Sequence, residues 1–381
     1  MTATNVHPDV ASTGGPGFDA ARRMLWVSLP DQRPRRELYW MSRMPNTAVT
    51  ALAATEPVGE INWVPTTYRR PITRFIEAGA FAWARGLDAQ QPSDFDWVTT
   101  LEVCSLVTGQ ASRWRSRGRG RGPRQAVITW ENLPDQPLYQ LPPYRQAVAS
   151  ARNADLLLCM VDAARDHLLF NGFDDARIRV VKPGVDTALF TPATTPVADP
   201  VVAFTSPLAP NKGIDRILEA MSLVRRTIPE ARLVVAGRGP LEPLVQAAAA
   251  DPAQQVTLVG SLDARGVADL LRSAAVFTTA PRPTWKWTEQ LGLAYLEAMA
   301  CGLPVVTTRC GTNDEAVIPP NDLVADDVEA IAAALLGWLS DPARRAVVGS
   351  ANRTHIVAHH DLATQCAAMG AAFADIEANG G

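Results

Sequence analysis

The chain has 381 residues, 36 of them basic and 39 acidic, which gives a formal charge of -3 at pH 7. This balance argues against wholesale nucleic-acid binding, and the length allows two domains that each have a core. Five cysteines without a C-x-x-C spacing indicate neither a disulfide framework nor a zinc site, so we expect reduced cysteines in a cytoplasmic protein. No apolar run approaches the ~20 residues needed to span a bilayer.

The first 21 residues predict a disordered leader. They are rich in Thr, Gly and Pro, and residues 1–19 contain no Lys, no Arg and no apolar core, which argues against a signal peptide. From residue 22 onward, strand and helix patterns alternate as in a Rossmann-like domain. The predicted strands cover residues 24–29, 47–52, 60–64 and 95–101, and a helix is predicted over residues 72–87.

Acidic residues follow two strands of this domain. Glu102 comes directly after the strand at 95–101, and Glu131-Asn132 follow a strand at 125–130. Each position has a structural alternative to a role in a site. Glu102 can be a charge at a helix N-terminus, and Glu131-Asn132 can form a turn before Pro134.

Residues 113–124 contain six arginines, several of them separated by glycine, and predict a mobile loop. Three interpretations compete: a solvated loop, a contact for anionic lipid headgroups, and an RGG-like nucleic-acid contact. The composition favours the solvated loop. A nucleic-acid contact needs more aromatic residues than Trp114 supplies, and no nucleic-acid partner is expected.

A second run of alternating strands and helices follows a linker rich in Pro, Thr and Ala at residues 192–200. The turn Gly237-Arg238-Gly239-Pro240 lacks the third glycine of a dinucleotide-binding fingerprint. The predicted strands before and within this run cover residues 154–160, 178–181, 201–205, 232–236, 256–259 and 275–279, and the closing helices cover residues 328–339 and 346–376.

The stretch from Trp287 to Thr308 predicts a loop, a helix over 291–301 and a buried strand. Glu289 precedes the helix at the carboxyl end of a strand, and Glu297 lies about two turns inside. Free amides at the helix start, together with Gly292, suit a phosphate, and a neighbouring carboxylate suits sugar hydroxyls. The alternative is a capping Glu289 and a surface Glu297.

These motifs occur in an order that closely resembles the retaining glycosyltransferases of family 4. The resemblance rests on Glu289-x7-Glu297 and the sequence after it, on Gly311-Thr-Asn-Asp-Glu315, and on three upstream segments. The upstream segments are Val185-Asp186 to Pro192, Lys212-Gly213-Ile214-Asp215 and Val234 to Pro240.

The resemblance implies an α/β GT-B fold, with two Rossmann-like doubly wound domains facing a central cleft. Residues 22–196 would form the acceptor-binding domain and its linker, and residues 197–355 the nucleotide-sugar-binding domain. Residues 356–381 would be a C-terminal helix that packs back on the first domain through Ala367, Ala371 and Phe373.

The resemblance also implies roles for individual residues. Lys212 and the helix start at Leu291, Gly292 and Leu293 would stabilise the departing diphosphate. Glu289 would hold hydroxyls of the donor sugar and Glu297 those of the ribose. The remaining implied contacts are Ser206, Gly237 and Arg238 to the nucleotide, and Glu102, Glu131 and Asn132 to the acceptor.

Two departures from the family pattern affect the proposed site. Relatives carry a Gly-Arg pair where this chain has Ser206-Pro207, and frequently a His where it has Trp130. A missing arginine removes one cation from the diphosphate site. The candidates to replace it are Arg238, Arg282 and Lys286.

The predicted reaction moves a hexose from an NDP-sugar to the hydroxyl of a glycan, glycolipid or small metabolite, with retention of configuration. Neither a cofactor nor a metal is expected. The protein would be cytoplasmic, with a peripheral contact to the inner membrane face through residues 113–124 as a further hypothesis. The alternatives are a non-catalytic protein that binds sugar nucleotides and a sugar-nucleotide epimerase of the same fold.

Overall fold

The computed structural model describes residues 21–29, 36–69, 83–118, 122–133, 137–140, 142–195, 197–285 and 287–379. The predicted leader up to residue 20, residues 72–82 of the predicted helix, and Lys286 lie outside this part. The chain divides into two compact units, each described by itself. The first unit contains the described residues up to Gly184 and those from Ala363 onward, and the second contains Val185–Leu362.

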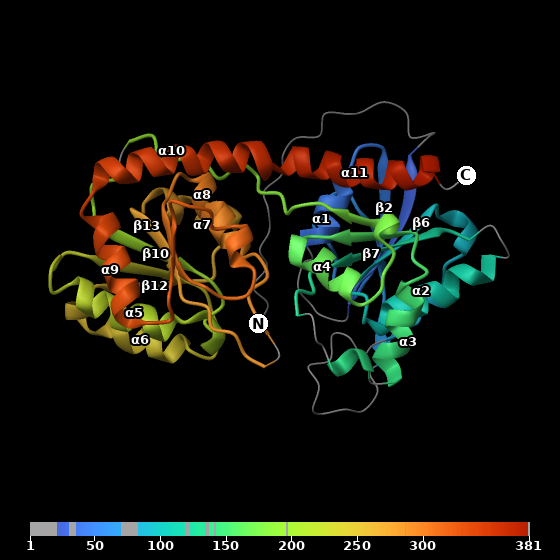
Figure 1. The fold of residues 1–381 in the computed structure, drawn as a ribbon, viewed down its shortest axis with the longest axis horizontal. Helices are drawn as coiled ribbons and strands as arrows, with labels where there is room; N and C mark the ends of the chain where they lie inside the picture. The colour runs from blue at the N-terminus through green and yellow to red at the C-terminus, as the bar shows by residue number, and fades with distance from the viewer. Residues whose placement is uncertain are drawn as a thin grey trace. The chain divides into compact units, whose positions relative to one another are not determined.

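The first unit contains a sheet of seven parallel strands in the order β3-β2-β1-β6-β7-β8-β9 (Figure 1). Its central strands are buried runs of apolar and β-branched residues, as expected for a parallel sheet covered on both faces. The strands are β1 (Arg22–Val27), β2 (Thr47–Ala53), β3 (Asn62–Pro65), β6 (Trp97–Leu101), β7 (Arg124–Thr129), β8 (Leu156–Cys159) and β9 (Ile178–Val180). The helices are α1 (Arg36–Ser42), α2 (Leu106–Arg115), α3 (Pro142–Ala151), α4 (Asp162–Phe170) and α11 (Leu362–Asn379).

The helix predicted over residues 72–87 is wrong in its described part. Trp83–Ala84 form strand β5, which pairs with β4 (Tyr68–Arg69), and a 3-10 turn covers Arg85–Ala89. The Gln110 side chain accepts a hydrogen bond from the Ala84 N–H and donates one to its carbonyl. These tertiary hydrogen bonds hold an extended segment despite its helical hydrophobic pattern.

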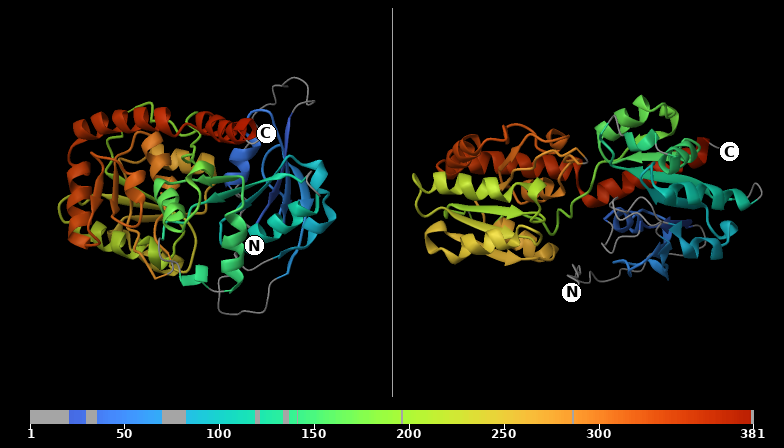
Figure 2. Two further views of the ribbon diagram at one scale, coloured as in Figure 1. Left: turned by 45° about the vertical axis from the view of Figure 1, so that its right-hand side comes forward. Right: turned by 90° about the horizontal axis from the view of Figure 1, so that it is seen from below.

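The second unit contains a sheet of six parallel strands in the order β12-β11-β10-β13-β14-β15. Helices cover both faces (Figure 2). Buried side chains of α5, α6 and α9 share one apolar core with the strands. The strands are β10 (Val201–Thr205), β11 (Arg232–Ala236), β12 (Val256–Gly260), β13 (Val276–Thr279), β14 (Val305–Thr308) and β15 (Asp322–Val324). The helices are α5 (Ile214–Val224), α6 (Glu242–Ala250), α7 (Ala264–Arg272), α8 (Leu293–Ala300), α9 (Val328–Leu339) and α10 (Pro342–His359).

Both sheets contain a topological switch point. In the second unit the chain runs outward from β10 through β11 to β12, and then returns to β13 beside β10. In the first unit the same reversal separates β1 from β6. Because the connections leave in opposite directions at such a point, an opening forms at the carboxyl ends of the two strands, where ligands of open α/β sheets bind.

The C-terminal helical region is two helices, α10 and α11, with a break at His360-Asp361. Within the first unit, α11 packs through Cys366, Met369, Gly370 and Phe373. Ala367 and Ala371 are exposed, so their predicted packing role is wrong, whereas Phe373 is fully buried and stacks edge-on against Trp97 at 4.7 Å between ring centroids. None of the described helices is long and apolar enough to cross a membrane.

Glu377 fastens α11 to the amino ends of β1 and β6. Its carboxylate accepts hydrogen bonds from Arg22 Nε and Nη2 at 2.7 and 2.9 Å, and from Trp97 Nε1 at 2.7 Å. Hydrogen bonding from Arg22 holds the pKa of Glu377 below its usual value. Because this pKa is lowered in the folded state, the stabilisation is present above the ordinary pKa of about 4.5 and is lost as the pH falls through the lowered value.

We therefore expect Glu377→Gln to speed hydrogen exchange of the α11 amides at pH 7 by roughly 5- to 30-fold, the equivalent of ~1–2 kcal/mol for a lost charge-assisted hydrogen-bond set. The difference from wild type should shrink at pH 4. Ala374→Gln, at an exposed position of the same helix, is the control and should leave exchange unchanged. A difference of equal size at both pH values would contradict this account of the carboxylate.

Candidate functional site

Lys212 and Glu289 meet at the switch point of the second unit. Lys212 ends a 3-10 turn, Pro210–Lys212, in the loop after β10, and Glu289 lies in the loop after β13. The two strands are parallel neighbours, so both loops leave the same edge of the sheet. Lys212 Nζ lies 2.6 Å from Glu289 Oε2, with only 19% and 11% of the two side chains exposed.

The two loops approach each other closely at Gly213. This residue has φ = 73°, and a Cβ at its position would lie 1.8 Å from the Ala280 carbonyl oxygen. Only glycine therefore allows the observed backbone path. A backbone hydrogen bond from Arg282 N to Asn211 O at 3.0 Å fastens the same loops together. The position of Lys212 is thus set by the backbone on both sides of the site.

Glu289 is held by the loop after β14. The Thr312 N–H donates to the Glu289 carbonyl at 3.1 Å, and a Cβ on Gly311 would lie 2.1 Å from that oxygen. The segment Gly311-Thr312, part of the sequence motif, therefore supports the loop that carries Glu289. Three successive strands of the sheet thus contribute to the position of one carboxylate.

Helix α8 begins beside Glu289, two residues later than predicted. Its N-cap is Gly292 with φ = 79°, so Leu291 and Gly292 precede the helix and Leu293 is its first residue. The Tyr295 hydroxyl bonds to Thr279 and Thr307 at 2.9 and 3.0 Å, which ties the helix start to β13 and β14. Burial raises the pKa of Tyr295, so the phenol stays neutral. Amide groups at this start lie on the same edge of the sheet as Lys212.

Glu297 lies inside α8 and is partly exposed. The loops after the neighbouring strands β10 and β11 contact each other at the carboxyl ends of these strands. Ser206 N donates to Ala236 O at 3.1 Å, Leu208 N donates to Arg238 O at 2.9 Å, and a Cβ on Gly237 would lie 2.0 Å from Ser206 O. The structure therefore brings Ser206, Gly237 and Arg238 to one place, as a shared site requires.

The candidate replacements for the missing arginine differ in their surroundings. Arg282 donates to both carboxylate oxygens of Asp215, at 2.8 and 2.9 Å, and to the Pro210 carbonyl. Arg238 lies 3.1 Å from Glu242 Oε1 and is largely exposed. Lys286 lies outside the described residues. Arg282 therefore has a structural role, and Arg238 is the more accessible of the two described arginines.

Trp287 is a residue of the candidate site to which the sequence analysis assigned no role. Its ring centroid lies 4.4 Å from Lys212 Nζ, within the range of a cation–π interaction. The signal available in the sequence was its position two residues before Glu289. That spacing places both side chains on the same side of an extended segment.

In the first unit, three carboxylates gather near the carboxyl ends of its central strands. Glu102 accepts hydrogen bonds from Thr129 Oγ1 at 2.8 Å and Trp130 N at 3.2 Å. The Trp130 indole N–H donates to Glu37 Oε1 at 2.7 Å. Glu131, in the following turn, accepts from Leu133 N at 3.1 Å. The sequence analysis missed Glu37, which is the second residue of α1.

Glu102 does not lie at a helix N-terminus, which was the structural alternative to a role in a site. Helix α2 starts at Leu106, and Ser105 is its N-cap. Glu102 instead has φ = 64°, a left-handed conformation that is unusual for a non-glycine residue. Burial, reinforced by the nearby Glu131, raises the pKa of Glu102 to about 8. Burial also raises the pKa of Glu131, whose side chain helps to form the turn before Pro134.

The arginine-rich segment is helical from Arg113 to Gly118, contrary to the predicted mobile loop. Helix α2 extends through Arg115 and a 3-10 turn covers Ser116–Gly118. The buried Trp114 fixes this part by donating its indole N–H to Gln90 O at 3.0 Å. Arg115 pairs with Asp155, and Arg117 pairs with Asp88 at 2.6 Å. Residues 119–121 lie outside the described part of the chain.

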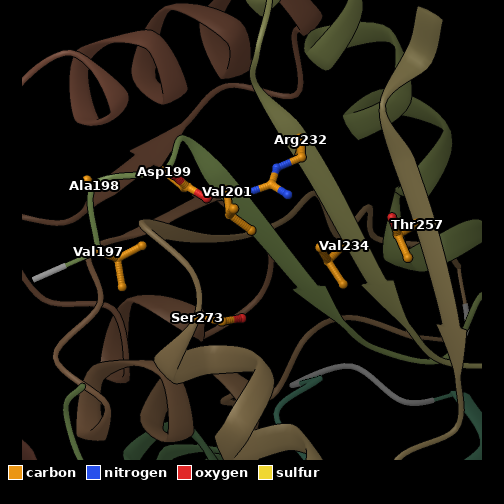
Figure 3. A pocket seen from close by; sticks show the side chains of 8 residues that line it. All are labelled: Val197, Ala198, Asp199, Val201, Arg232, Val234, Thr257 and Ser273. Carbon is orange, nitrogen blue, oxygen red and sulfur yellow. Dashed lines mark hydrogen bonds and ion pairs between the residues drawn. The ribbon is translucent and has the colours of Figure 1, made fainter. Parts of the chain in front are cut away.

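A cavity of about 430 Å³ in the second unit lies at the opposite edge of the sheet (Figure 3). It is formed at the amino ends of β10, β11 and β12, and Ser273, just before β13, completes its lining. Arg232 and Asp199 pair across it at 2.6 Å and neutralise each other. Lys212 and Glu289 are at the carboxyl ends of the strands and do not line this cavity.

Part of the sequence of this chain is similar to a known protein family and to known enzymes. The family model described as Glycosyl transferases group 1 matches residues 199–341. A GDP-mannose-dependent monoacylated alpha-(1-6)-phosphatidylinositol monomannoside mannosyltransferase of Corynebacterium glutamicum is 36% identical over 46% of this chain and 50% of its own length. A GDP-mannose-dependent alpha-(1-6)-phosphatidylinositol dimannoside mannosyltransferase of Mycobacterium tuberculosis is 31% identical over 64% of this chain and 66% of its own length. The chain thus spans about half to two thirds of the length of these relatives.

Solved structures extend the likeness to nearly the whole chain. Anabaena HepE in complex with UDP and glucose aligns with a TM-score of 0.72 and 18% identity, over 93% of this chain and all of that chain. Sucrose-phosphate synthase of Thermosynechococcus elongatus aligns with a TM-score of 0.71 and 20% identity, over 94% of this chain and all of that chain. The chain therefore has the GT-B fold, and its residues 199–341 match the family model of the Glycosyl transferases group 1.

Proposed function

We propose that this protein transfers a hexose from a nucleoside-diphosphate sugar to an acceptor hydroxyl, with retention of configuration. The observation that carries the proposal is the Lys212–Glu289 pair at the switch point of a group 1 glycosyltransferase domain. A cation and a carboxylate at this place match the two ends of a sugar diphosphate, which are an anionic leaving group and a ring with hydroxyl groups.

In this proposal the second unit holds the donor. Negative charge builds up on the diphosphate as the glycosidic bond breaks, and Lys212 with the amides at Leu291, Gly292 and Leu293 stabilises it. Once Lys212 turns to the diphosphate, Glu289 accepts hydrogen bonds from sugar hydroxyls. Glu297 binds the ribose hydroxyls, and the loops of Ser206, Gly237 and Arg238 lie near the nucleotide. No step is assigned to a metal or cofactor.

The first donor to test is GDP-mannose, because the relatives reported above are named GDP-mannose-dependent mannosyltransferases. UDP-glucose is the matched comparison, because the structural neighbour HepE was solved with UDP and glucose.

The acceptor is proposed to bind to the first unit near Glu102, Glu131 and Asn132. The relatives are named for phosphatidylinositol mannoside acceptors, which makes a glycolipid the first class to test, ahead of soluble glycans and metabolites. Peripheral binding to an anionic inner membrane face through Arg113–Arg124 fits such an acceptor. Arg115 and Arg117 already pair with aspartates, which leaves less of the segment's charge for lipid headgroups.

Replacing either Lys212 or Glu289 should strongly reduce transfer. Lys212→Met and Glu289→Gln preserve side-chain size, and each should lower kcat by ~10²–10³, the usual cost of removing one preorganised group that stabilises charge. Transfer to a glycolipid acceptor would be measured by release of GDP or UDP. Lys182→Ala removes a lysine that pairs with Asp162 at 2.7 Å in the first unit, and serves as the control. Near-normal turnover in both site variants would reject the mechanism.

A panel of sugar nucleotides tests donor choice and separates the alternative functions. A ligand present at 100 times its Kd adds ~2.7 kcal/mol to stability, so the true donor should clearly raise the melting temperature. We expect GDP-mannose to exceed UDP-glucose and ADP-glucose, and Lys212→Met to reduce the shift. Donor binding without NDP release in the presence or absence of acceptor would indicate a binding protein. Formation of an epimerised sugar, detected by NMR, would indicate an epimerase.

Glu102→Gln should stabilise the fold while reducing transfer. Because the folded-state pKa of Glu102 is raised to about 8, the folded protein binds more protons than the unfolded chain between the ordinary pKa and pH 8. Glu102 therefore costs stability increasingly as the pH rises from 5 to 8. The gain in urea midpoint of Glu102→Gln should grow over the same range. A gain that does not depend on pH, or unchanged transfer, would contradict the proposed role.

A further inference from the structure

The Lys212 ammonium group is contacted on two sides by side chains of one loop. Glu289 accepts its hydrogen bond at 2.6 Å, and the Trp287 ring lies 4.4 Å away. Lysine carries three N–H donors on a flexible stem, so an ammonium without neighbours would sample many rotamers. The carboxylate and the ring restrict these rotamers before any ligand arrives.

The backbone fixes the ring in this place. Thr284 and Trp287 form an antiparallel bridge, with hydrogen bonds from Thr284 N to Trp287 O at 2.7 Å and from Trp287 N to Thr284 O at 3.4 Å. Thr288, between the two residues that contact Lys212, is buried, and its hydroxyl lies 3.6 Å from Cys310 Sγ. Alternation along the segment therefore directs Trp287 and Glu289 to the same lysine.

The indole face differs chemically from a second carboxylate. It attracts a cation through its quadrupole, but it does not neutralise the charge or compete strongly for N–H donors. It also removes water from one side of the ammonium group, which strengthens the attraction between the remaining charge and an incoming anion. The ring thus suits a lysine that must later bind phosphate oxygens.

We propose that Trp287 is a positioning residue for Lys212. It holds the ammonium group toward the diphosphate of the donor, in a site where Pro207 takes the place of a second cation. This inference rests on the proposed function, because it assumes that Lys212 binds the diphosphate. Its consequence is that Trp287 affects affinity for the phosphate part of the nucleotide through the charge of Lys212.

The test measures binding by calorimetry, using whichever of GDP, UDP and ADP binds the wild-type chain most tightly. Trp287→Leu should weaken binding of that diphosphate by roughly 3- to 30-fold, the range of a cation–π interaction. Trp287→Phe, which keeps an aromatic face, should recover part of the loss. Binding of the matching nucleoside monophosphate should change less. Trp285→Leu, on the same turn and at a ring that is 85% exposed, is the matched control and should bind normally.

A double-mutant cycle with Lys212→Met tests whether Trp287 changes diphosphate affinity through the charge of Lys212. If Trp287 acts through the lysine charge, Trp287→Leu should change affinity by less than about 2-fold in the Lys212→Met background. An equal loss in both backgrounds, an equal loss in Trp285→Leu, or no rescue by phenylalanine would overturn the inference. Circular dichroism of each variant confirms that the fold is intact.

The outcome also separates this inference from the proposed function. If the wild-type chain binds none of the three diphosphates, the proposed function and this inference are both rejected. If Lys212→Met weakens diphosphate binding while Trp287→Leu binds as wild type, the inference alone is rejected and the proposed role of Lys212 stands. A loss in kcat that follows the loss in diphosphate affinity would extend the role of the ring to stabilisation of the leaving group.

Discussion

The ion pair between Lys212 and Glu289 depends on the parallel pairing of β10 with β13, and it gives the second unit its chemical character. The two side chains are largely buried, and moving both charges out of water costs free energy that their attraction offsets only in good geometry. A chain with apolar residues of similar size at these two positions would be at least as stable. A fold that places two backbone-braced loops around such a pair is therefore better explained by ligand binding than by stability.

The first unit also has ionisable groups at its switch point, and the groups gathered there are carboxyl groups. Glu102 lies at its switch point in a left-handed backbone conformation, with Glu131 near enough to raise its pKa further. Among the described residues, the hydroxyl of Thr129 and the amide of Trp130 donate hydrogen bonds to the Glu102 carboxyl group. In both units the strands are apolar and well packed, and the energetically unfavourable groups are at the carboxyl ends of the strands where the chain reverses direction. Strained residues of this kind are typical of functional sites.

The sequence pattern predicted the helices and strands that depend on residues close together in the chain. Apolar periodicity located the helix before Cys301 to within two residues at its start, and runs of apolar and β-branched residues located the strands of both sheets apart from β15, which the sequence analysis missed. It failed where distant residues decide the outcome. The Trp130 indole reaches Glu37 across 93 positions, and Arg282 binds Asp215 across 67. Within the helix predicted over 72–87, Trp83–Ala84 are extended and Gln110 bonds to both backbone groups of Ala84. No local pattern contains these contacts.

Hydrogen bonds within the second unit occupy several groups near Lys212 that could otherwise bind a diphosphate in the proposed site. In the loop after β10, the Ser206 N–H already donates to Ala236 O and the Leu208 N–H to Arg238 O, while Pro207 has no N–H to offer. Arg282, the nearby guanidinium group, is bound to Asp215. In the proposed site, the described groups left for a diphosphate are thus the amides before α8, the Lys212 ammonium and the exposed Arg238 guanidinium. Lys212 is the largely buried cation of these groups, so the site gains most when the orientation of Lys212 is fixed.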